Sequence, residues 1–240
     1  MRLSRVLLGA LAGAQVAYGQ LPGRRSPAAT RALVGLMLGA SAAEAVDARG
    51  WRRGALPVGA AGALGFGAEL VGVATGRPFG RYTYSGQLGP RVGGVPLLAA
   101  AAWAMMARPA WVAAGWVAGR GPARVPAAAA ALTAWDVFLD PRMAREGYWS
   151  WPGGGRYEGV PASNFAGWFV TALLVYAAWT ALDPDAPDRD DDGALALYAW
   201  TWTGETFANA VLWRRPRVAA AGAAAMGAVA GPALWRRLRP

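Results

Sequence analysis

The chain has 240 residues and contains no cysteine, no histidine and no lysine, so that all of its 24 basic residues are arginine. Without cysteine or histidine it lacks the usual zinc ligands, a cysteine nucleophile and a histidine general base. Without lysine it cannot form a Schiff base with a carbonyl substrate. Acid–base chemistry therefore has to come from carboxyl and hydroxyl groups, and we expect no metal and no cofactor.

Long apolar runs are the main feature of the composition, which is 55% hydrophobic. A helix needs about 20 apolar residues to cross a bilayer, and runs of this kind recur along the whole chain. This pattern predicts an all-α fold: one integral-membrane domain over residues 1–240, a polytopic bundle of about eight spans, with seven to nine allowed. The expected runs are 3–20, 30–46, 55–75, 95–119, 126–140, 164–182, 193–213 and 217–235.

The charges support the same placement in a cell membrane as a multi-pass protein. The net charge is +10, and the arginines are scattered between the apolar runs. Such a distribution is typical of contact with anionic lipid headgroups and argues against nucleic acid as a partner. The first run, 3–20, fits a retained membrane helix better than a cleaved signal peptide.

The segments between the runs lead to four further expectations. Residues 47–54 are expected to form an arginine-rich loop, and residues 75–96 a compact, ordered loop at the mouth of a site. The run 95–119 is either one helix kinked at Pro109 or two short helices. Residues 183–192, DPDAPDRDDD, are expected to be a solvated acidic connector and not a metal motif.

Asp136 and Asp140 are the main catalytic candidates, because they end an apolar run and lie four residues apart. Residues at this spacing share one face of a helix. Acids at membrane depth are costly and mark a functional site by default. Two like charges on adjacent turns favour one neutral acid beside one ionised carboxylate. Glu69, inside the third run, is a third candidate, with an ion pair to an arginine as its simpler explanation.

Aromatic and polar residues around these acids are candidates for binding substrate. Aromatic faces can contact an apolar chain and stabilise a cation on it, although anchoring at the membrane interface is the alternative explanation. Asn164 is expected either to hold a water molecule or to cap the sixth helix. The predicted substrate-binding residues are Tyr82, Tyr84, Trp135, Trp149, Trp151, Tyr157, Asn164, Trp168 and Glu205, the last placed by its depth in the seventh run.

Two blocks of the sequence resemble a known family. They read ELVGVATGRPFGRYTYSGQLGPRVGGVP at 69–96 and DVFLDPRMAREGYWSWPGGGRYEGVPASNFAGW at 136–168. Both are similar to the integral-membrane carotenoid biosynthesis protein family, whose members include CruF-type carotenoid 1′,2′-hydratases. The resemblance implies addition of water to the terminal double bond of an acyclic carotenoid end. It implies a carotenoid substrate, water and the lipid bilayer as partners, with other carotenoid biosynthesis enzymes as further candidates.

Two other functions stay open at this point. The D-x-x-x-D spacing of Asp136 and Asp140 also suits a membrane prenyltransferase that holds magnesium and a prenyl diphosphate, although no second acidic motif lies inside another run. A non-catalytic protein, either a transporter or a carotenoid-binding scaffold, is the other alternative. A transporter should contain interrupted helices in corresponding halves of the chain, and we find no such pair.

Overall fold

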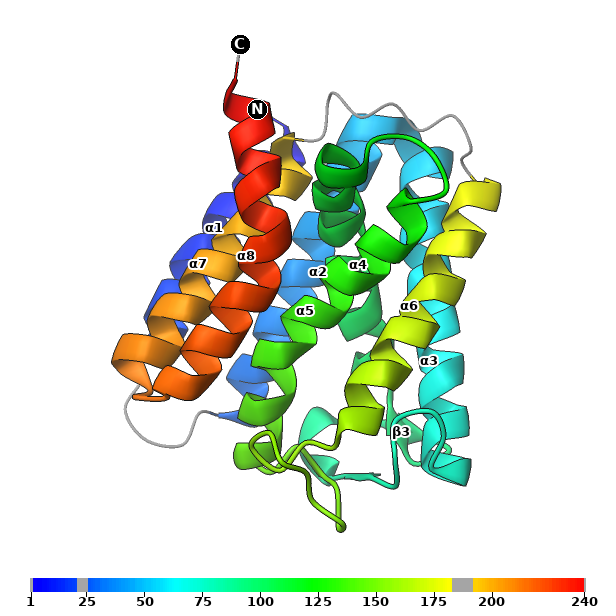
Figure 1. The fold of residues 1–240 in the computed structure, drawn as a ribbon, viewed down its shortest axis with the longest axis vertical. Helices are drawn as coiled ribbons and strands as arrows, with labels where there is room; N and C mark the ends of the chain where they lie inside the picture. Colours follow the sequence, from blue (N-terminus) through cyan, green and yellow to red (C-terminus); the bar gives the residue numbers. More distant parts are fainter. Residues whose placement is uncertain (1, 21–25, 183–191, 240) are drawn as a thin grey trace.

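The computed structural model describes residues 2–20, 26–182 and 192–239, and these form a bundle of eight α-helices (Figure 1). The helices are α1 (Leu3–Gly19), α2 (Pro27–Gly50), α3 (Leu56–Thr75), α4 (Leu97–Ala118), α5 (Arg124–Arg145), α6 (Ala162–Leu182), α7 (Asp192–Phe207) and α8 (Pro216–Leu238). The predicted acidic connector lies outside the described residues, except for Asp192 at the start of α7.

Four helical stretches are long and apolar enough to cross a membrane: Pro27–Thr75, Leu97–Ala118, Ala162–Leu182 and Pro216–Leu238. The first of these stretches contains both α2 and α3. The mostly helical architecture agrees with the expected fold class. A total near eight membrane spans stays a prediction.

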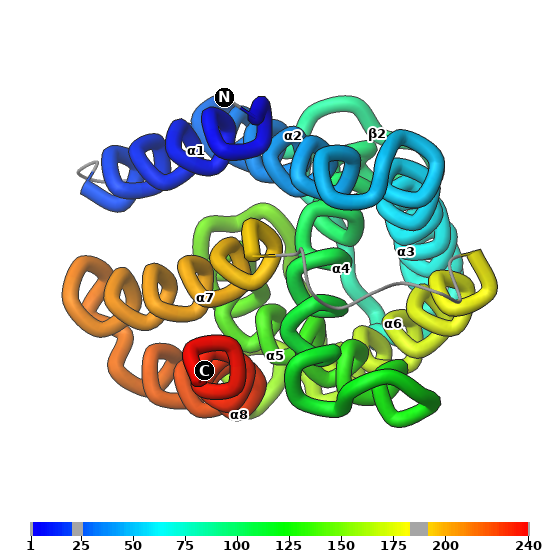
Figure 2. The backbone as a smooth tube through the Cα atoms, turned by 90° about the horizontal axis from the view of Figure 1, so that it is seen from above, coloured from blue at the N-terminus to red at the C-terminus, as the bar shows by residue number. Residues whose placement is uncertain are grey.

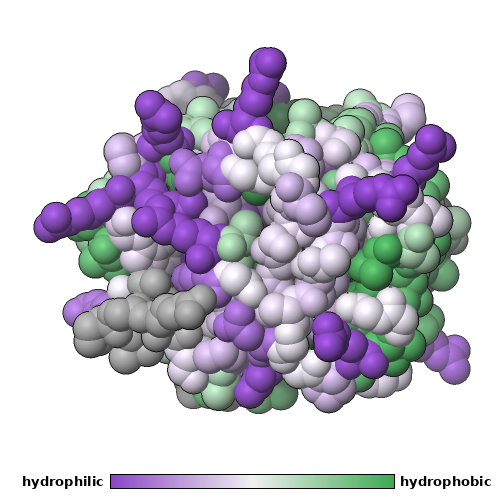
Figure 3. Space-filling view, turned by 90° about the horizontal axis from the view of Figure 1, so that it is seen from below, coloured by the Kyte–Doolittle hydropathy of each residue, from purple (hydrophilic) through white to green (hydrophobic). Residues whose placement is uncertain are grey.

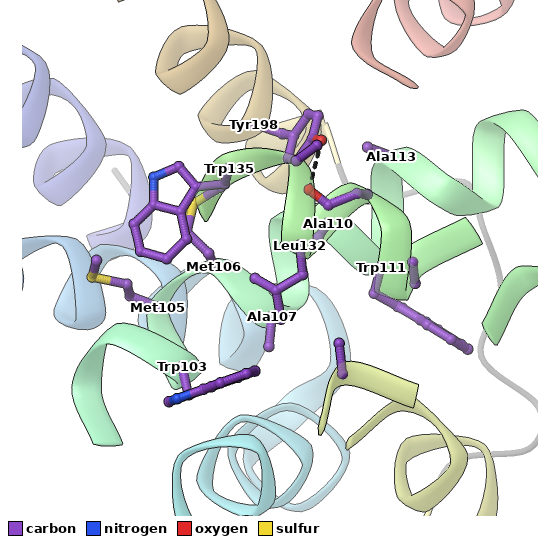
Figure 4. Packing of buried hydrophobic residues seen from close by; sticks show 14 of the residues in the cluster. Trp103, Met105, Met106, Ala107, Ala110, Trp111, Ala113, Leu132, Trp135 and Tyr198 are labelled. Atoms are coloured by element: carbon purple, nitrogen blue, oxygen red, sulfur yellow. Dashed lines mark hydrogen bonds between the residues drawn. The ribbon is translucent and has the colours of Figure 1, made fainter. Parts of the chain in front are cut away.

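Helix α4 is the centre of the bundle, where it packs against α2, α3, α5, α7 and α8. Its apolar stretch is 72% buried, compared with 33–39% in the other three candidate spans. Alanines on α4 allow close approach of its neighbours, and its larger buried side chains fill the remaining space (Figure 4). Within this core the Tyr198 hydroxyl donates to the Ala131 carbonyl oxygen at 2.9 Å.

The predicted loop at 47–54 is wrong, because α2 continues to Gly50 and a π-helical turn, Trp51–Ala55, leads directly into α3. Gly50 has φ +76°, a conformation that residues with a Cβ atom rarely adopt. Gly54 is equally constrained, since a Cβ atom there would lie 2.3 Å from the Ala45 carbonyl oxygen. Two glycines therefore let the chain reverse direction without a loop.

The loops at the lower end of Figure 1 are ordered and pair with each other. Strand β1 (Thr83–Tyr84) pairs antiparallel with β4 (Trp149–Ser150), and β2 (Arg91–Val92) pairs antiparallel with β3 (Val95–Pro96). The loop 75–96 is thus compact, as predicted. Seen from below, this end of the described structure carries many hydrophilic side chains, with hydrophobic residues towards its rim (Figure 3).

Helix α5 passes through Pro141 and ends at Arg145, so the predicted helix end at Asp140 is wrong; α4 likewise passes through Pro109 as one helix. Proline has no N–H to donate to the carbonyl group four residues earlier, which here belongs to Val137. The Tyr157 hydroxyl supplies the missing donor, at 3.0 Å from the Val137 oxygen. Burial raises the pKa of Tyr157 to about 12, so the hydroxyl keeps its proton.

We therefore expect Tyr157→Phe to lower the free energy of unfolding by about 1–3 kcal/mol, because it leaves the Val137 carbonyl group without a donor. Chemical unfolding in detergent micelles measures this change. In a Pro141→Ala background the alanine N–H can reach the same carbonyl oxygen, and the loss should then shrink. An equal loss in both backgrounds would contradict the explanation.

Candidate active site

Asp136 and Asp140 lie on one face of α5, as predicted, and both are almost fully buried, at 0% and 2% exposure. Asn164 of α6 joins them, since its amide nitrogen donates to Asp136 Oδ2 at 2.9 Å and also to Asp140 Oδ2. Trp149 Nε1 donates to the second oxygen of Asp140 at 3.1 Å. One amide nitrogen therefore bridges the two carboxyl groups.

Asn164 therefore does not act as a helix cap. It lies inside α6, which begins at Ala162, and its side chain donates to the two carboxyl groups. A capping side chain would instead accept a hydrogen bond from the first turn of the helix.

Glu69 of α3 is held by three hydrogen-bond donors. Tyr82 and Tyr84 donate to its Oε2, the latter at 2.9 Å, and Trp103 Nε1 donates to Oε1 at 3.2 Å. Burial, together with the negative charge of Glu69, holds the pKa of both tyrosines well above the usual value, so they remain neutral donors. The alternative of an ion pair between Glu69 and an arginine is wrong, because its described partners are all neutral.

The three carboxyl groups belong to one cluster, because Asn164 bridges Asp136 and Asp140, and Asp140 and Glu69 line the same cavity. Their hydrogen-bond partners distinguish them from Glu44, the other buried acid among the described residues. Glu44 pairs with Arg108 at 2.5 Å, whereas the members of this cluster have no ion-pair partner among the described residues. Their charge is therefore not cancelled by a fixed cation.

A cavity of about 460 Å³ reaches this cluster, and Asp140, Glu69 and Asn164 line it. Asp136 is not among the lining residues, so of the two aspartates it is Asp140 that borders the cavity. Among the residues that the structure describes, no group of three or more acids is arranged to hold a metal ion.

Most of the predicted aromatic residues form the walls of this cavity, namely Tyr82, Tyr84, Trp135, Trp149, Trp151 and Trp168. Trp168 stacks on Trp103, with ring centres 4.0 Å apart and planes tilted by 16°. Trp151 is fixed by its Nε1, which donates to the Phe79 carbonyl oxygen at 3.2 Å. Tyr157 differs from the rest, because it lies outside the cavity lining and supports α5 as described above.

Glu205 lines another part of the same cavity, where it forms an ion pair with Arg142 at 3.3 Å. Asn209 donates to the Glu205 carbonyl and carboxyl oxygens at 2.9 and 3.3 Å, so the two residues lie on the same face of the helix. Arg142 also lines the cavity.

Sequence reasoning missed Trp103 and Arg142. Trp103 is 34 positions from Glu69, and nothing in an alanine-rich run indicates which distant carboxyl group its N–H will meet. For Arg142 there was a signal, since it follows the Asp140–Pro141 pair directly and lies in the matched motif.

The fold and the site define a helical bundle with apolar, membrane-type helices and a buried acidic cavity walled by aromatic rings. The family follows from a comparison of sequences: residues 30–230 match the profile of the family described as carotenoid biosynthesis protein. The chain belongs to this family, which confirms the resemblance drawn from the two motif blocks.

The chain is also similar to the bisanhydrobacterioruberin hydratase of Haloarcula japonica. The two are 33% identical over 128 residues, which cover 51% of this chain and 43% of that protein. The chain thus matches less than half the length of this relative. No solved structure matches the chain.

The Asn164 bridge leads to a stability prediction. Asn164→Leu keeps a similar volume but removes the donor from both carboxyl groups, and hydrogen bonds to charged groups contribute about 1.5–3 kcal/mol each. We expect the free energy of unfolding in micelles to fall by about 2–4 kcal/mol. The loss should be smaller in an Asp136→Asn background, because the residues are coupled. If the double variant lost the sum of the two single losses of unfolding free energy, Asn164 would not be coupled to Asp136.

Proposed function

We propose that the protein is a membrane-embedded carotenoid hydratase, a hydro-lyase that adds water to the terminal double bond of an acyclic carotenoid end. The observation that carries this proposal is the set of three buried carboxyl groups that are held by neutral donors only, two of which, Asp140 and Glu69, border an apolar, aromatic-walled cavity. Membership of the carotenoid biosynthesis family and the similarity to a hydratase support it. The apolar helical stretches support a multi-pass position in the cell membrane.

The first step is proton transfer to the alkene. Asp140, which faces the cavity, donates its proton to the less substituted carbon of the terminal double bond. The π electrons form the new C–H bond, and the other carbon becomes a tertiary cation. The hydrogen bonds from Asn164 and Trp149 stabilise the Asp140 carboxylate that remains.

The cation is then captured by water. Negative charge on Glu69 and the faces of the aromatic walls stabilise the cation, each ring by about 0.5–2 kcal/mol. A water molecule forms the C–O bond and gives one proton to Glu69. Return of that proton to Asp140 restores both groups, so the reaction consumes one water and needs no oxidant or reductant. Asp136 acts through Asn164, which donates to both aspartates.

The alternatives fit the site less well. In a magnesium-dependent prenyltransferase the two aspartates would face a cation, but here an N–H donor of Asn164 lies between them. A non-catalytic carotenoid scaffold would have no use for costly buried acids that lack ion-pair partners.

The acids provide the direct test of the mechanism. Replacing a catalytic acid by its amide keeps shape and removes the labile proton, and such groups contribute about 10²–10⁴-fold in rate. We expect Asp136→Asn, Asp140→Asn and Glu69→Gln each to lower hydration by at least about 100-fold. The assay is mass analysis of pigments in cells that make an acyclic carotenoid, with the amount of folded protein in the membrane measured in parallel.

Glu205→Gln is the matched control, because it removes a carboxyl group that lines the same cavity but already pairs with Arg142. We expect it to alter stability or substrate fit and to leave most of the hydration rate. Near-normal hydration by both aspartate variants would remove the pair from the mechanism.

A chelator separates the hydratase from the prenyltransferase. Protonation by carboxyl groups needs no metal, so membranes treated with chelator should keep their full hydration rate. Loss of activity that magnesium restores would instead support the prenyltransferase.

A further inference from the structure

The two ends of the cavity differ in their exposure. At the acidic end the lining residues are buried, with Trp103 at 1%, Asp140 at 2% and Trp168 at 5% exposure. At the other end the lining residues include Val16 at 50% and Phe207 at 57% exposure. The cavity is therefore closed behind the carboxyl groups and open far from them.

The open end lies between α1 and the C-terminal part of α7 with the turn that follows it. The lining there comes from α1, which supplies Val16, and from Phe207 and Leu212, which are all exposed and apolar. Seen from above, α1 and α7 lie on the same side of the bundle (Figure 2). One hydrogen bond joins the two helices, from Trp200 Nε1 to Gln15 Oε1 at 2.7 Å.

This rim is unlike the lower end face of the bundle. Its exposed side chains Val16, Phe207 and Leu212 are apolar and the exposed Gln20 is polar, whereas the end face carries many hydrophilic side chains (Figure 3). An apolar rim on the side of an apolar bundle suits a ligand that arrives from the hydrocarbon region of a bilayer. A long polyene dissolved in that region is such a ligand.

We propose that the carotenoid enters lengthwise through the α1–α7 opening, with its acyclic end first, and that one end reacts in each binding event. This inference rests on the proposed hydratase function. Because the cavity is closed behind Asp140 and Glu69, the chain cannot pass through and present its other end. Internal double bonds cannot reach the acids for the same reason. The second end of a symmetric substrate is modified only after release and renewed entry.

The order of products tests this inference. With lycopene, whose two ends are identical, the product hydrated at one end should form first, leave the protein and accumulate before the doubly hydrated product. A time course on isolated membranes with excess substrate, analysed by mass, measures the ratio. Doubly hydrated product from the earliest times, without the singly hydrated one, would overturn the inference while leaving the hydratase function intact.

A blocked opening gives an independent test. Gly204 of α7 lines the cavity, and a Cβ atom added there meets no atom within 4 Å, so the side chain of Gly204→Trp starts in open space and extends along the cavity wall. The matched control is Gly13→Trp on α1, where a Cβ atom also meets nothing within 4 Å but the residue does not line the cavity. We expect Gly204→Trp to lower kcat/KM by at least about tenfold and Gly13→Trp to leave it unchanged.

The possible outcomes are distinct. Equal activity of the two glycine variants, at equal protein levels in the membrane, would overturn the proposed route. Absence of hydration in the unaltered protein would overturn the proposed function and this inference with it. Loss in Gly204→Trp alone, together with early release of singly hydrated product, is the result that the inference requires.

Discussion

The burial of three carboxyl groups is the constraint on which the rest of this structure depends. A carboxyl group in an apolar interior is tolerated only when hydrogen bonds replace those of water. The donors come from every side: Trp103 on α4, Asn164 on α6, and Tyr82, Tyr84 and Trp149 on the loops below the bundle. The helices carry the carboxyl groups and the loops of the end face carry several of their donors. The hydrogen bonds between them therefore hold the loops against the helices.

The same bundle stabilises its acids in two ways. The buried Glu44 pairs with Arg108 and the half-buried Glu205 pairs with Arg142. A buried pair is costly to break, and the arginine favours the ionised form of the carboxyl group. The carboxyl groups at the cavity have neutral partners, so no fixed cation holds them in the ionised state. That difference, more than burial itself, marks Asp140 and Glu69 as groups that can exchange a proton with a substrate.

Periodicity and residue spacing were sufficient for the helical class, for most helix boundaries and for the shared face of Asp136 and Asp140. They were not sufficient where a backbone carbonyl group is satisfied by a donor that is distant in the sequence. Pro141 appeared to end its helix, because the sequence does not reveal that the Tyr157 hydroxyl serves the carbonyl group that proline leaves free. The reversal at Gly50 was likewise expected to be a loop, since a π-helical turn has no clear sequence signature.

For the site, the sequence predicted which residues take part but not how they are arranged. The matched motif named the acids and most of the aromatic walls, but spacing along the chain could not say that of the two aspartates it is Asp140 that borders the cavity. Nor could it say that Trp103 donates to Glu69, because that contact depends on how α3 packs against α4. Long-range packing decides which member of a pair meets the substrate.

Isotope labelling during turnover tests the central claim most directly. Membranes containing the protein are given an acyclic carotenoid in water that carries heavy oxygen and deuterium. The account predicts that each modified end gains one labelled oxygen on the more substituted carbon and one deuterium on its neighbour, since acid and nucleophile both exchange with solvent. A pigment of unchanged mass, or one that has gained a prenyl group without solvent oxygen, would contradict it.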